Sequence, residues 1–513
     1  MTDATTDQRL PFGLFLRLST MMALQWALWM PIPFLYPYLS DGLGFTNTQC
    51  AIITIVAFVG VMFGPIAGQA VDRWVNTEKY LGISHLLGAV VVLQLFWFTD
   101  FWMFFLCSLV YSLLYGPTIA LTNSLCFHHL PDRDRHFGIV RVCGAVGFIP
   151  ATIFMGHWLL HQHKPTPEQA VDLLVAEGKV QESEKAALLL RRHVLLENGE
   201  TVVGELVSGE EGPEVVLRTD AGERTVSTET ALVRHDDAIK QKQDKTINSG
   251  IRDAFMLNAI FGLIMGLYCF SLPRTPPRKG KTEKQAFTAA LGEVKRQPLI
   301  TLFAIAVPLS CIHQFYFYHT AKFINEFDFR TPLFDAIFGV GGGGMMTLGQ
   351  MSEMLVMATI GFYAAKFSRK SLLFLGLLAY VLRFAFFAYA RDFEAIGISA
   401  DVSVVIALLL HGPCYTWFMF LGYMIVDEET TPDVRGSAQS LYNLVLMGLG
   451  IIVGSLIAGH IADLHTTDGD MDYKGLFTWP FIGSVLCAVA LLIFYPGGKR
   501  TPRAADETAA LET

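Results

Sequence analysis

Twelve apolar blocks, each about 20 residues or longer, run through this 513-residue sequence. A block of that length spans the hydrocarbon core of a bilayer when it is helical. Only 16% of the residues are charged, whereas a soluble chain carries roughly 25%. Because a backbone in lipid must satisfy its own hydrogen bonds, the blocks predict an all-α membrane protein with twelve transmembrane helices. They lie near residues 14–38, 48–71, 79–99, 101–127, 137–161, 251–272, 298–324, 337–365, 370–390, 402–426, 436–464 and 476–495.

The positions of Lys and Arg predict how the chain is oriented. If the N-terminus is cytoplasmic, the cytoplasmic loops and the tail are rich in basic residues, whereas the opposite short loops hold few, such as Arg330, Arg391 and Lys474. This asymmetry predicts that both termini are cytoplasmic. No cleavable signal peptide is expected, because the first apolar block is too long for a signal-peptide core. The basic residues of the cytoplasmic side are Arg73, Lys79, Arg133, Arg135, Arg274, Arg278, Lys279, Lys281, Lys284, Lys366, Arg369, Lys370, Lys499, Arg500 and Arg503.

Two polar stretches interrupt the apolar blocks. The first, 162–248, is a predicted extracytoplasmic insert. Its first half has the spacing of two short amphipathic helices, and its second half alternates apolar and polar residues between glycine-containing turns. That pattern predicts short helices followed by a small antiparallel β-sheet. The insert is either a solvated decoration or a binding site for a partner or the cell envelope.

The second polar stretch, 274–297, is the predicted cytoplasmic link between the sixth and seventh spans. It opens with prolines and lysines, and Glu283 to Arg296 has the spacing of an amphipathic helix on the membrane surface. Six spans, a basic link and six further spans predict a secondary transporter built from two six-helix bundles. The expected units are an N-terminal bundle at 1–161 completed by span six at 249–273, the insert at 162–248, the linker at 274–297, a C-terminal bundle at 298–496 and a tail at 497–513.

One carboxylate lies where a carboxylate is costly. Glu353 is near the middle of the apolar, glycine-rich run 339–362. A charge at the centre of a transmembrane helix costs roughly 2.5–3.5 kcal/mol on the insertion scale, so such residues usually line a cavity or an ion path. Gln350 precedes Glu353 by three positions and shares its helical face. The pair indicates a solute or proton site; the alternative is a structural charge paired with a neighbouring helix.

Several segments carry a resemblance to a known family. The stretch from Gly64 to Arg73 resembles, loosely, the loop signature of the major facilitator superfamily. Five further segments follow in order along the membrane part, and together they resemble the bacterial nucleoside:proton symporters of that superfamily. The resemblance implies a monomer in the bacterial inner membrane. The segments are Tyr115-Gly-Pro117-Thr118 with Asn123, Arg141-Val-Cys-Gly144 with Gly147 and Phe148, Gln350-Met-Ser352-Glu353, Leu382-Arg383-Phe384, and Arg435-Gly-Ser437-Ala438-Gln439.

This resemblance implies a central substrate site between the bundles. Amides and carboxylates orient ribose hydroxyls and base edges, and aromatic rings offer stacking faces. A carboxylate in a site shielded from water can also load and release a proton, which makes Glu353 the expected proton-coupling residue. The implied substrate-binding residues are Arg141, Phe148, Gln314, Gln350, Glu353, His411, Tyr415 and Thr416.

The sequence departs from the family pattern at three of the polar positions. Thr416 stands where the family tends to place an acidic residue, Ala145 where a hydroxyl residue can occur, and Phe317 where an amide is found. These changes make the expected pocket more apolar and aromatic.

Other functional classes are disfavoured or kept as alternatives. No nucleotide-binding GxxxxGK[ST] loop is present, which disfavours ATP-driven pumping. The eight dispersed cysteines show no metal-ligand spacing, and neither a cofactor nor a nucleic-acid partner is expected; the partners are a small solute, a proton and the lipid bilayer. A receptor or sensor without coupled transport remains an alternative. So does a membrane enzyme using His128 and His129 beside Asp132 and Asp134.

Two arginines within the spans have structural alternatives to a role in the site. The Arg141 side chain could extend to the cytoplasmic membrane interface, and Arg383 could form hydrogen bonds between helices.

Overall fold

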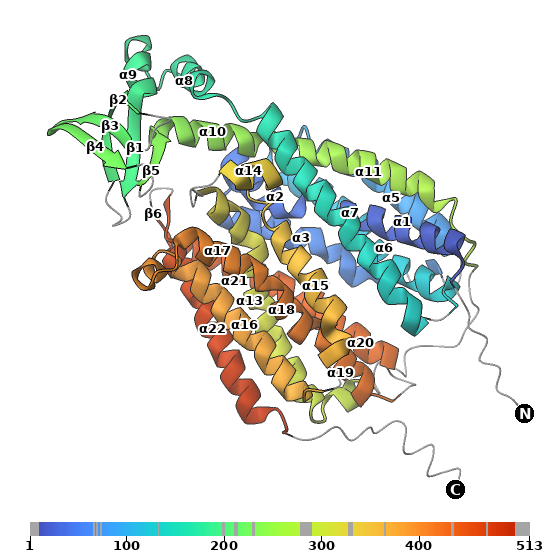
Figure 1. Ribbon diagram of the computed structural model, residues 1–513. Helices are drawn as coiled ribbons and strands as arrows, with labels where there is room; N and C mark the ends of the chain where they lie inside the picture. The colour runs from blue at the N-terminus through green and yellow to red at the C-terminus, as the bar shows by residue number, and fades with distance from the viewer. Residues whose placement is uncertain are drawn as a thin grey trace, which may run out of the picture.

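Two helical bundles lie side by side in the computed structural model, and a small sheet projects beyond one end of them (Figure 1). Nine helices within the described residues are long and apolar enough to cross a membrane. Each of the twelve predicted spans overlaps a helical segment, which confirms the all-α membrane architecture with a small sheet insert. The structure describes residues 10–64, 67, 70–71, 74–131, 133–196, 201–209, 214–227, 231–276, 290–326, 332–363, 366–431, 435–467 and 470–497.

The N-terminal bundle begins with a span that proline divides into three pieces. Pro31, Pro33 and Pro37 cannot donate backbone hydrogen bonds, so the span runs as α1, α2 and a π-helical turn, η1. Asp100 caps α6 by accepting from two backbone amides. The elements of this bundle are α1 (Phe12–Ala27), α2 (Ile32–Pro37), η1 (Tyr38–Gly42), α3 (Asn47–Val59), η2 (Gly60–Phe63), α5 (Thr77–Gln94), α6 (Phe101–His129), α7 (Arg133–Gln162) and α11 (Asp253–Cys269).

The C-terminal bundle contains a break that the sequence pattern did not predict. Span eight was expected as one helix near 337–365, but Gly339, Gly341 and Gly342 have φ of 70°, 89° and 71°. That left-handed backbone interrupts a helix, so α15 begins only at Thr347. The elements are α13 (Leu299–Glu326), α14 (Pro332–Phe338), α15 (Thr347–Tyr363), α16 (Arg369–Ala388), η4 (Asp392–Ile396), α17 (Ala400–Leu409), α18 (His411–Cys414), η5 (Tyr415–Phe420), α19 (Leu421–Glu429), α20 (Arg435–Asn443), η6 (Leu444–Leu449), α21 (Gly450–Leu464), β6 (Thr466–Thr467), β7 (Asp470–Met471) and α22 (Tyr473–Phe494).

The insert contains a five-stranded antiparallel sheet in the order β4-β3-β2-β1-β5. Alternation of apolar and polar residues places Val194, Val202, Val215, Leu217 and Val226 together in its core. This confirms the predicted small sheet. The elements are α8 (Pro167–Ala176), η3 (Glu182–Glu184), α9 (Lys185–Leu190), β1 (Arg191–Leu196), β2 (Thr201–Ser208), β3 (Glu214–Thr219), β4 (Gly222–Ser227), β5 (Ala231–His235) and α10 (Asp237–Gly250), which leads into α11.

Some predictions fall on residues outside the described ranges. Most of the expected amphipathic helix at 283–296 does so, and only a short helical piece from 290 to 294 is described. Asp72 and Arg73 of the loop signature and most of the tail at 497–513 also lie outside the described residues.

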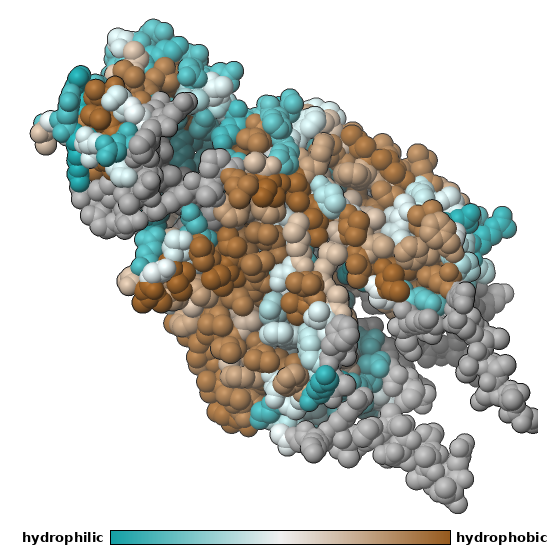
Figure 2. Space-filling view, in the orientation of Figure 1, coloured by the Kyte–Doolittle hydropathy of each residue, from teal (hydrophilic) through white to brown (hydrophobic). Residues whose placement is uncertain are grey.

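Large apolar side chains cover the sides of both bundles. Examples are Val90 on α5, Leu267 on α11 and Leu486 on α22, which are 59%, 65% and 64% exposed. Figure 2 shows these surfaces as a broad hydrophobic area below the mostly hydrophilic insert. An apolar surface of this extent is stable against lipid and not against water. It therefore fits a membrane-embedded body with the insert outside the bilayer.

Candidate functional site

The site is positioned by close helix crossings on both bundles. On the N-terminal side α7 crosses α1 so tightly that a Cβ on Gly147 would lie 1.9 Å from the carbonyl oxygen of Ala23. On the C-terminal side α15 packs against the end of α17 and the start of α18, and the Ser352 hydroxyl donates to the Leu409 carbonyl of α17 at 2.5 Å. A Cβ on Gly412 would lie 2.4 Å from that hydroxyl oxygen. These close contacts fix the positions of the helices that carry the candidate site residues. Arg141 lies on α7, Glu353 on α15 and His411 on α18.

The glycine at the α7–α1 crossing gives a testable consequence for stability. We expect Gly147→Val to destabilise the protein by about 1–3 kcal/mol, because the backbone of α1 must move to admit the side chain. The measurement is the thermal unfolding midpoint in detergent. Val146→Ala, which changes a lipid-facing side chain that is 56% exposed, is the control and should leave the midpoint nearly unchanged. An unchanged midpoint for Gly147→Val would contradict the close crossing.

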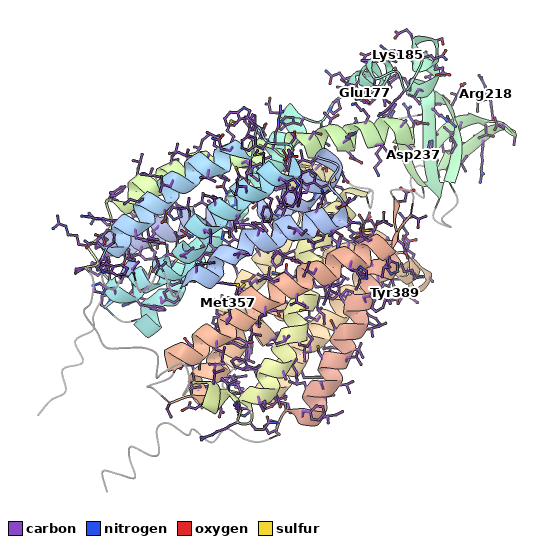
Figure 3. All side chains as sticks on the ribbon, turned by 180° about the vertical axis from the view of Figure 1, so that it is seen from behind. Glu177, Lys185, Arg218, Asp237, Met357 and Tyr389 are labelled. Atoms are coloured by element: carbon purple, nitrogen blue, oxygen red, sulfur yellow. The ribbon has the colours of Figure 1, made fainter. Side chains whose placement is uncertain are left out.

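Glu353 and His411 form a pair in the C-terminal bundle. An oxygen of the Glu353 carboxylate lies 3.5 Å from Nε2 of His411. The His411 side chain is 1% exposed and that of Glu353 is 23% exposed. Figure 3 labels Met357, four residues after Glu353 on the same face of α15, at the boundary between the bundles. The carboxylate is therefore partly accessible, while its histidine partner is fully enclosed.

Arg141 faces this pair from the other bundle. Its guanidinium carbon lies 4.1 Å from the ring centre of Trp26, a cation–π contact with α1. Glu353 and Tyr415 are both within electrostatic range of Arg141. Phe148 is buried seven residues further along α7, which is the same helical face as Arg141. The contact with Trp26 and the proximity of Glu353 fit a site residue better than one that only reaches the lipid interface.

Aromatic rings extend the site from His411. Its imidazole stacks on Tyr316 at 4.8 Å and on Tyr415 at 6.3 Å between ring centres. Tyr415 and Thr416 belong to the π-helix η5, a distortion that is frequent at functional sites. Arg383 lies on the face of Tyr316, with its guanidinium carbon 3.5 Å from the ring centre. Stacking of this kind depends on tertiary structure and has no signal in the spacing of the sequence.

Several buried polar atoms here lack a hydrogen-bond partner within the described residues. They are Oε1 of Gln350, Nδ1 of His411, Oγ1 of Thr416 and the three nitrogens of the Arg383 guanidinium. The Cys414 thiol and the Tyr316 hydroxyl lie near Arg383, but neither makes a hydrogen bond of ordinary geometry with it. Since buried polar groups are normally paired, this group of unsatisfied atoms marks the cluster as a candidate site.

Gln314 packs toward α21, and a pocket that the sequence did not predict lies in the other bundle. Gln314 is buried on α13, and its side chain packs closely against the backbone of Gly454 on α21. A Cβ added to Gly454 would lie 2.9 Å from Cγ of Gln314. A pocket of about 70 Å³ lies inside the N-terminal bundle, lined by Trp29, Tyr111, Tyr115 and other mostly apolar side chains. It contains none of the predicted site residues, and that volume suits a few water molecules and not a nucleoside.

The polar contacts that join the two bundles in the described part of the chain gather at the end that carries the insert, called here the insert end. Lys322 of α13 pairs with Asp41 of η1 at 2.9 Å. Lys164, just after α7, pairs with Asp335 of α14 at 3.2 Å. Four more hydrogen bonds join the bundles: Thr48 to Asp463 at 3.1 Å, Tyr318 to the Asn47 carbonyl at 2.9 Å, the Val340 amide to the Gly156 carbonyl at 3.0 Å, and Nε2 of His157 with the Ile337 carbonyl at 3.2 Å. Away from the insert the bundles diverge in Figure 1, and the surface in Figure 2 is notched between them.

The fold has clear relatives among solved structures. The crystal structure of the nucleoside transporter NupG matches with a TM-score of 0.67 at 20% identity, covering 95% of this chain and 100% of that one. The inward-open xylose transporter XylE of Escherichia coli matches with a TM-score of 0.56 at 14% identity, covering 98% and 99%. These likenesses confirm the predicted major facilitator fold.

Sequence comparison identifies the family. The nucleoside permease NupG of Escherichia coli K12 is 22% identical over 498 residues, 94% of this chain and 96% of its own length. The xanthosine permease of the same organism is 24% identical over 487 residues, 94% and 95%. A family model described as Nucleoside H+ symporter matches residues 12–187 and 246–500, on either side of the sheet. The chain therefore belongs to the nucleoside:proton symporter family, as the resemblance of its motifs predicted.

Proposed function

We propose that this protein imports nucleosides across the bacterial inner membrane together with protons, and that Glu353 is the group that exchanges the proton. The observation that supports this most directly is the Glu353–His411 pair, a partly exposed carboxylate at the bundle boundary with Arg141 facing it. A carboxylate in such a place is costly unless it is paired or protonated. Protonation removes its charge and weakens its attraction to Arg141 across the boundary.

The proposed cycle is alternating access by rocking of one bundle on the other. With both termini cytoplasmic, the insert end faces the outside, and its ion pairs close that side. Divergence of the bundles away from the insert then corresponds to an inward-facing state. Opening to the outside must break these ion pairs before a proton and solute can bind there, and the pairs form again when that side closes, before release to the cytoplasm.

The proposed solute site uses the polar atoms that lack partners and the rings around them. Gln350, Thr416 and His411 offer both donors and acceptors to ribose hydroxyls and base edges. Phe148 and Tyr415 offer apolar faces to the base. Thr416 supplies a hydroxyl where the family tends to place an acid, so Glu353 carries the coupling alone in this proposal. The proposed binding residues are Arg141, Phe148, Gln314, Gln350, Glu353, His411, Tyr415 and Thr416.

The test is uptake of radiolabelled uridine and adenosine into proteoliposomes containing the purified protein. Saturable uptake that rises with an inward proton gradient supports symport. Uptake that ignores the gradient would contradict proton coupling while leaving the solute site in place. Absence of nucleoside uptake by folded protein would overturn the proposal. The receptor alternative has no support from the relatives described above, which are named as transporters or permeases.

Replacement of Tyr415 tests the stacking face. We expect Tyr415→Leu to raise the KM for nucleosides by about two- to tenfold, because aromatic stacking contributes roughly 0.5–1.5 kcal/mol beyond area burial. Vmax should change less, since the substitution leaves the Glu353–His411 pair intact. The measurement is the concentration dependence of initial uptake. Tyr389→Leu, on the same bundle but at the end of α16, is the matched control. An unchanged KM for Tyr415→Leu would remove Tyr415 from the site.

A further inference from the structure

The sheet of the insert lies outside the part of the chain that matches the family model, which covers residues 12–187 and 246–500. Both of its connections to the membrane body nevertheless reach the ion pairs that close the insert end. One connection is α10, which leads into α11, and the other is the segment that follows α7 and enters α8. The insert is therefore attached at the point where the two bundles meet.

The first connection contacts the Asp41–Lys322 pair directly. The Asn248 side-chain amide on α10 donates to one oxygen of Asp41 at 3.2 Å, and the other oxygen accepts from Lys322 at 2.9 Å. Asn248 is only 3% exposed. The backbones are also in close contact, because a Cβ on Gly42 would lie 2.9 Å from the Asn248 carbonyl oxygen. Asn248 therefore orients the Asp41 carboxylate from one side, while the Ser40 hydroxyl donates at 3.0 Å to the oxygen that bonds to Lys322.

The second connection carries another pair between the bundles. Lys164 follows the last turn of α7 and bonds to Asp335 of α14 at 3.2 Å. It lies one residue before Pro165, whose carbonyl accepts from the Gln243 side chain on α10 at 2.7 Å. The two connections are therefore tied to each other next to the boundary between the bundles.

The two connections are also held together above the membrane body. Ala170 and Val171 of α8 pack against Ile239 of α10 in a small apolar core. The Lys242 ammonium on α10 bonds to Glu177 after α8, and Lys179 bonds to the same carboxylate at 3.0 Å. Hydrogen bonds from Lys242 and Lys179 lower the pKa of Glu177 to about 2, so this carboxylate is charged at neutral pH. Helices α8 and α10, called here the brace, form one unit.

We infer that the brace stabilises the closed insert end, and that Asn248 is a positioning residue of the transport cycle that acts through Asp41. The charge-assisted bond from Asn248 holds one oxygen of the Asp41 carboxylate and directs the other toward Lys322. The Asp41 side chain is therefore already in the rotamer that the ion pair requires. Through Asn248 the brace bonds to Asp41, the N-terminal-bundle partner in the ion pair with Lys322, and so favours closure of the insert end. The relevance to transport rests on the proposed function, whereas the effect on the distance between bundles does not.

Distances between spin labels at the insert end test this role. The labels are placed by Trp97→Cys, after α5, and Ile396→Cys, in η4; these exposed residues lie at the insert end of the two bundles. Protein without the two introduced cysteines is treated with the spin label in parallel, and its signal is subtracted to correct for labelling of the native cysteines. We expect Asn248→Ala to add a population with a longer distance, and Asn248→Asp to increase it further because its carboxylate repels Asp41. Gln241→Ala, an exposed amide on the same helix, is the matched control.

Two further readouts separate positioning from loss of structure. The thermal midpoint of Asn248→Ala should stay close to that of the wild type, while the KM for external nucleoside falls severalfold because more molecules present an open insert end. Unchanged distances in folded Asn248→Ala would overturn the inference. A lowered midpoint with unchanged distances would also do so, since it assigns Asn248 a structural role only. If the wild type transports no nucleoside, the distances still decide the role of the brace, so the two proposals fail separately.

Discussion

Glu353→Gln should abolish the part of nucleoside uptake that an inward proton gradient drives. The substitution keeps the size of the side chain and can still hydrogen-bond to His411, but it cannot bind or release a proton. Because no proton can enter with the solute, Vmax/KM under a gradient should fall to its value without one, a decrease of about tenfold or more. The measurement is initial uptake into proteoliposomes at fixed internal pH, with and without an acidic exterior.

The same variant should retain exchange of external for internal nucleoside without a gradient, because exchange does not require the proton to leave. Retained exchange separates lost coupling from a lost solute site. Glu223→Gln, which changes an exposed carboxylate on β4, is the matched control and should behave as the wild type. Gradient-stimulated uptake by Glu353→Gln would assign the proton to another group.

The overall fold could be predicted from the sequence because membranes allow so few solutions. Apolar blocks of bilayer length can only be helices or closed barrels, and blocks of more than 20 residues are too long for barrel strands. The same logic singled out Glu353, because a charge in such a block is costly unless it has a function or a partner. The alternation of Val and polar residues in the insert likewise predicted the sheet.

The details of the site could not be predicted in the same way. The π-helix at Tyr415 and the left-handed glycines before α15 are local distortions that keep the apolar composition of a span. The stacking of Arg383 on Tyr316 joins helices α16 and α13 through their tertiary arrangement. Asp41 and Lys322 are 281 residues apart in sequence, and no periodicity in either segment indicates that they meet. Contacts between bundles are set by packing of the whole fold, which a pattern within one helix does not describe.

Reversing the charge of Lys322 should shift the protein out of the closed state at the insert end. In Lys322→Glu a carboxylate faces Asp41, where the wild type has an ion pair at 2.9 Å and the lysine side chain is 11% exposed. Like charges in contact cost several kcal/mol, so uptake should fall by about tenfold or more. The same spin-label distance should lengthen, since the bundles separate at this end.

The decisive comparison is the double variant Asp41→Lys with Lys322→Glu, which restores an ion pair with its polarity reversed. If the pair acts mainly by joining the bundles, the double variant should recover much of the uptake and of the short distance that each single reversal loses. The single variant Asp41→Lys is the remaining corner of the cycle, and the non-additive part measures the coupling between the two residues. Recovery should be incomplete, because Asn248 is oriented to donate to a carboxylate at position 41 and meets an ammonium there instead. Double and single variants with equal uptake and equal distances would show that the pair does not close the insert end. Full recovery would leave the pair in place but contradict the positioning role of Asn248.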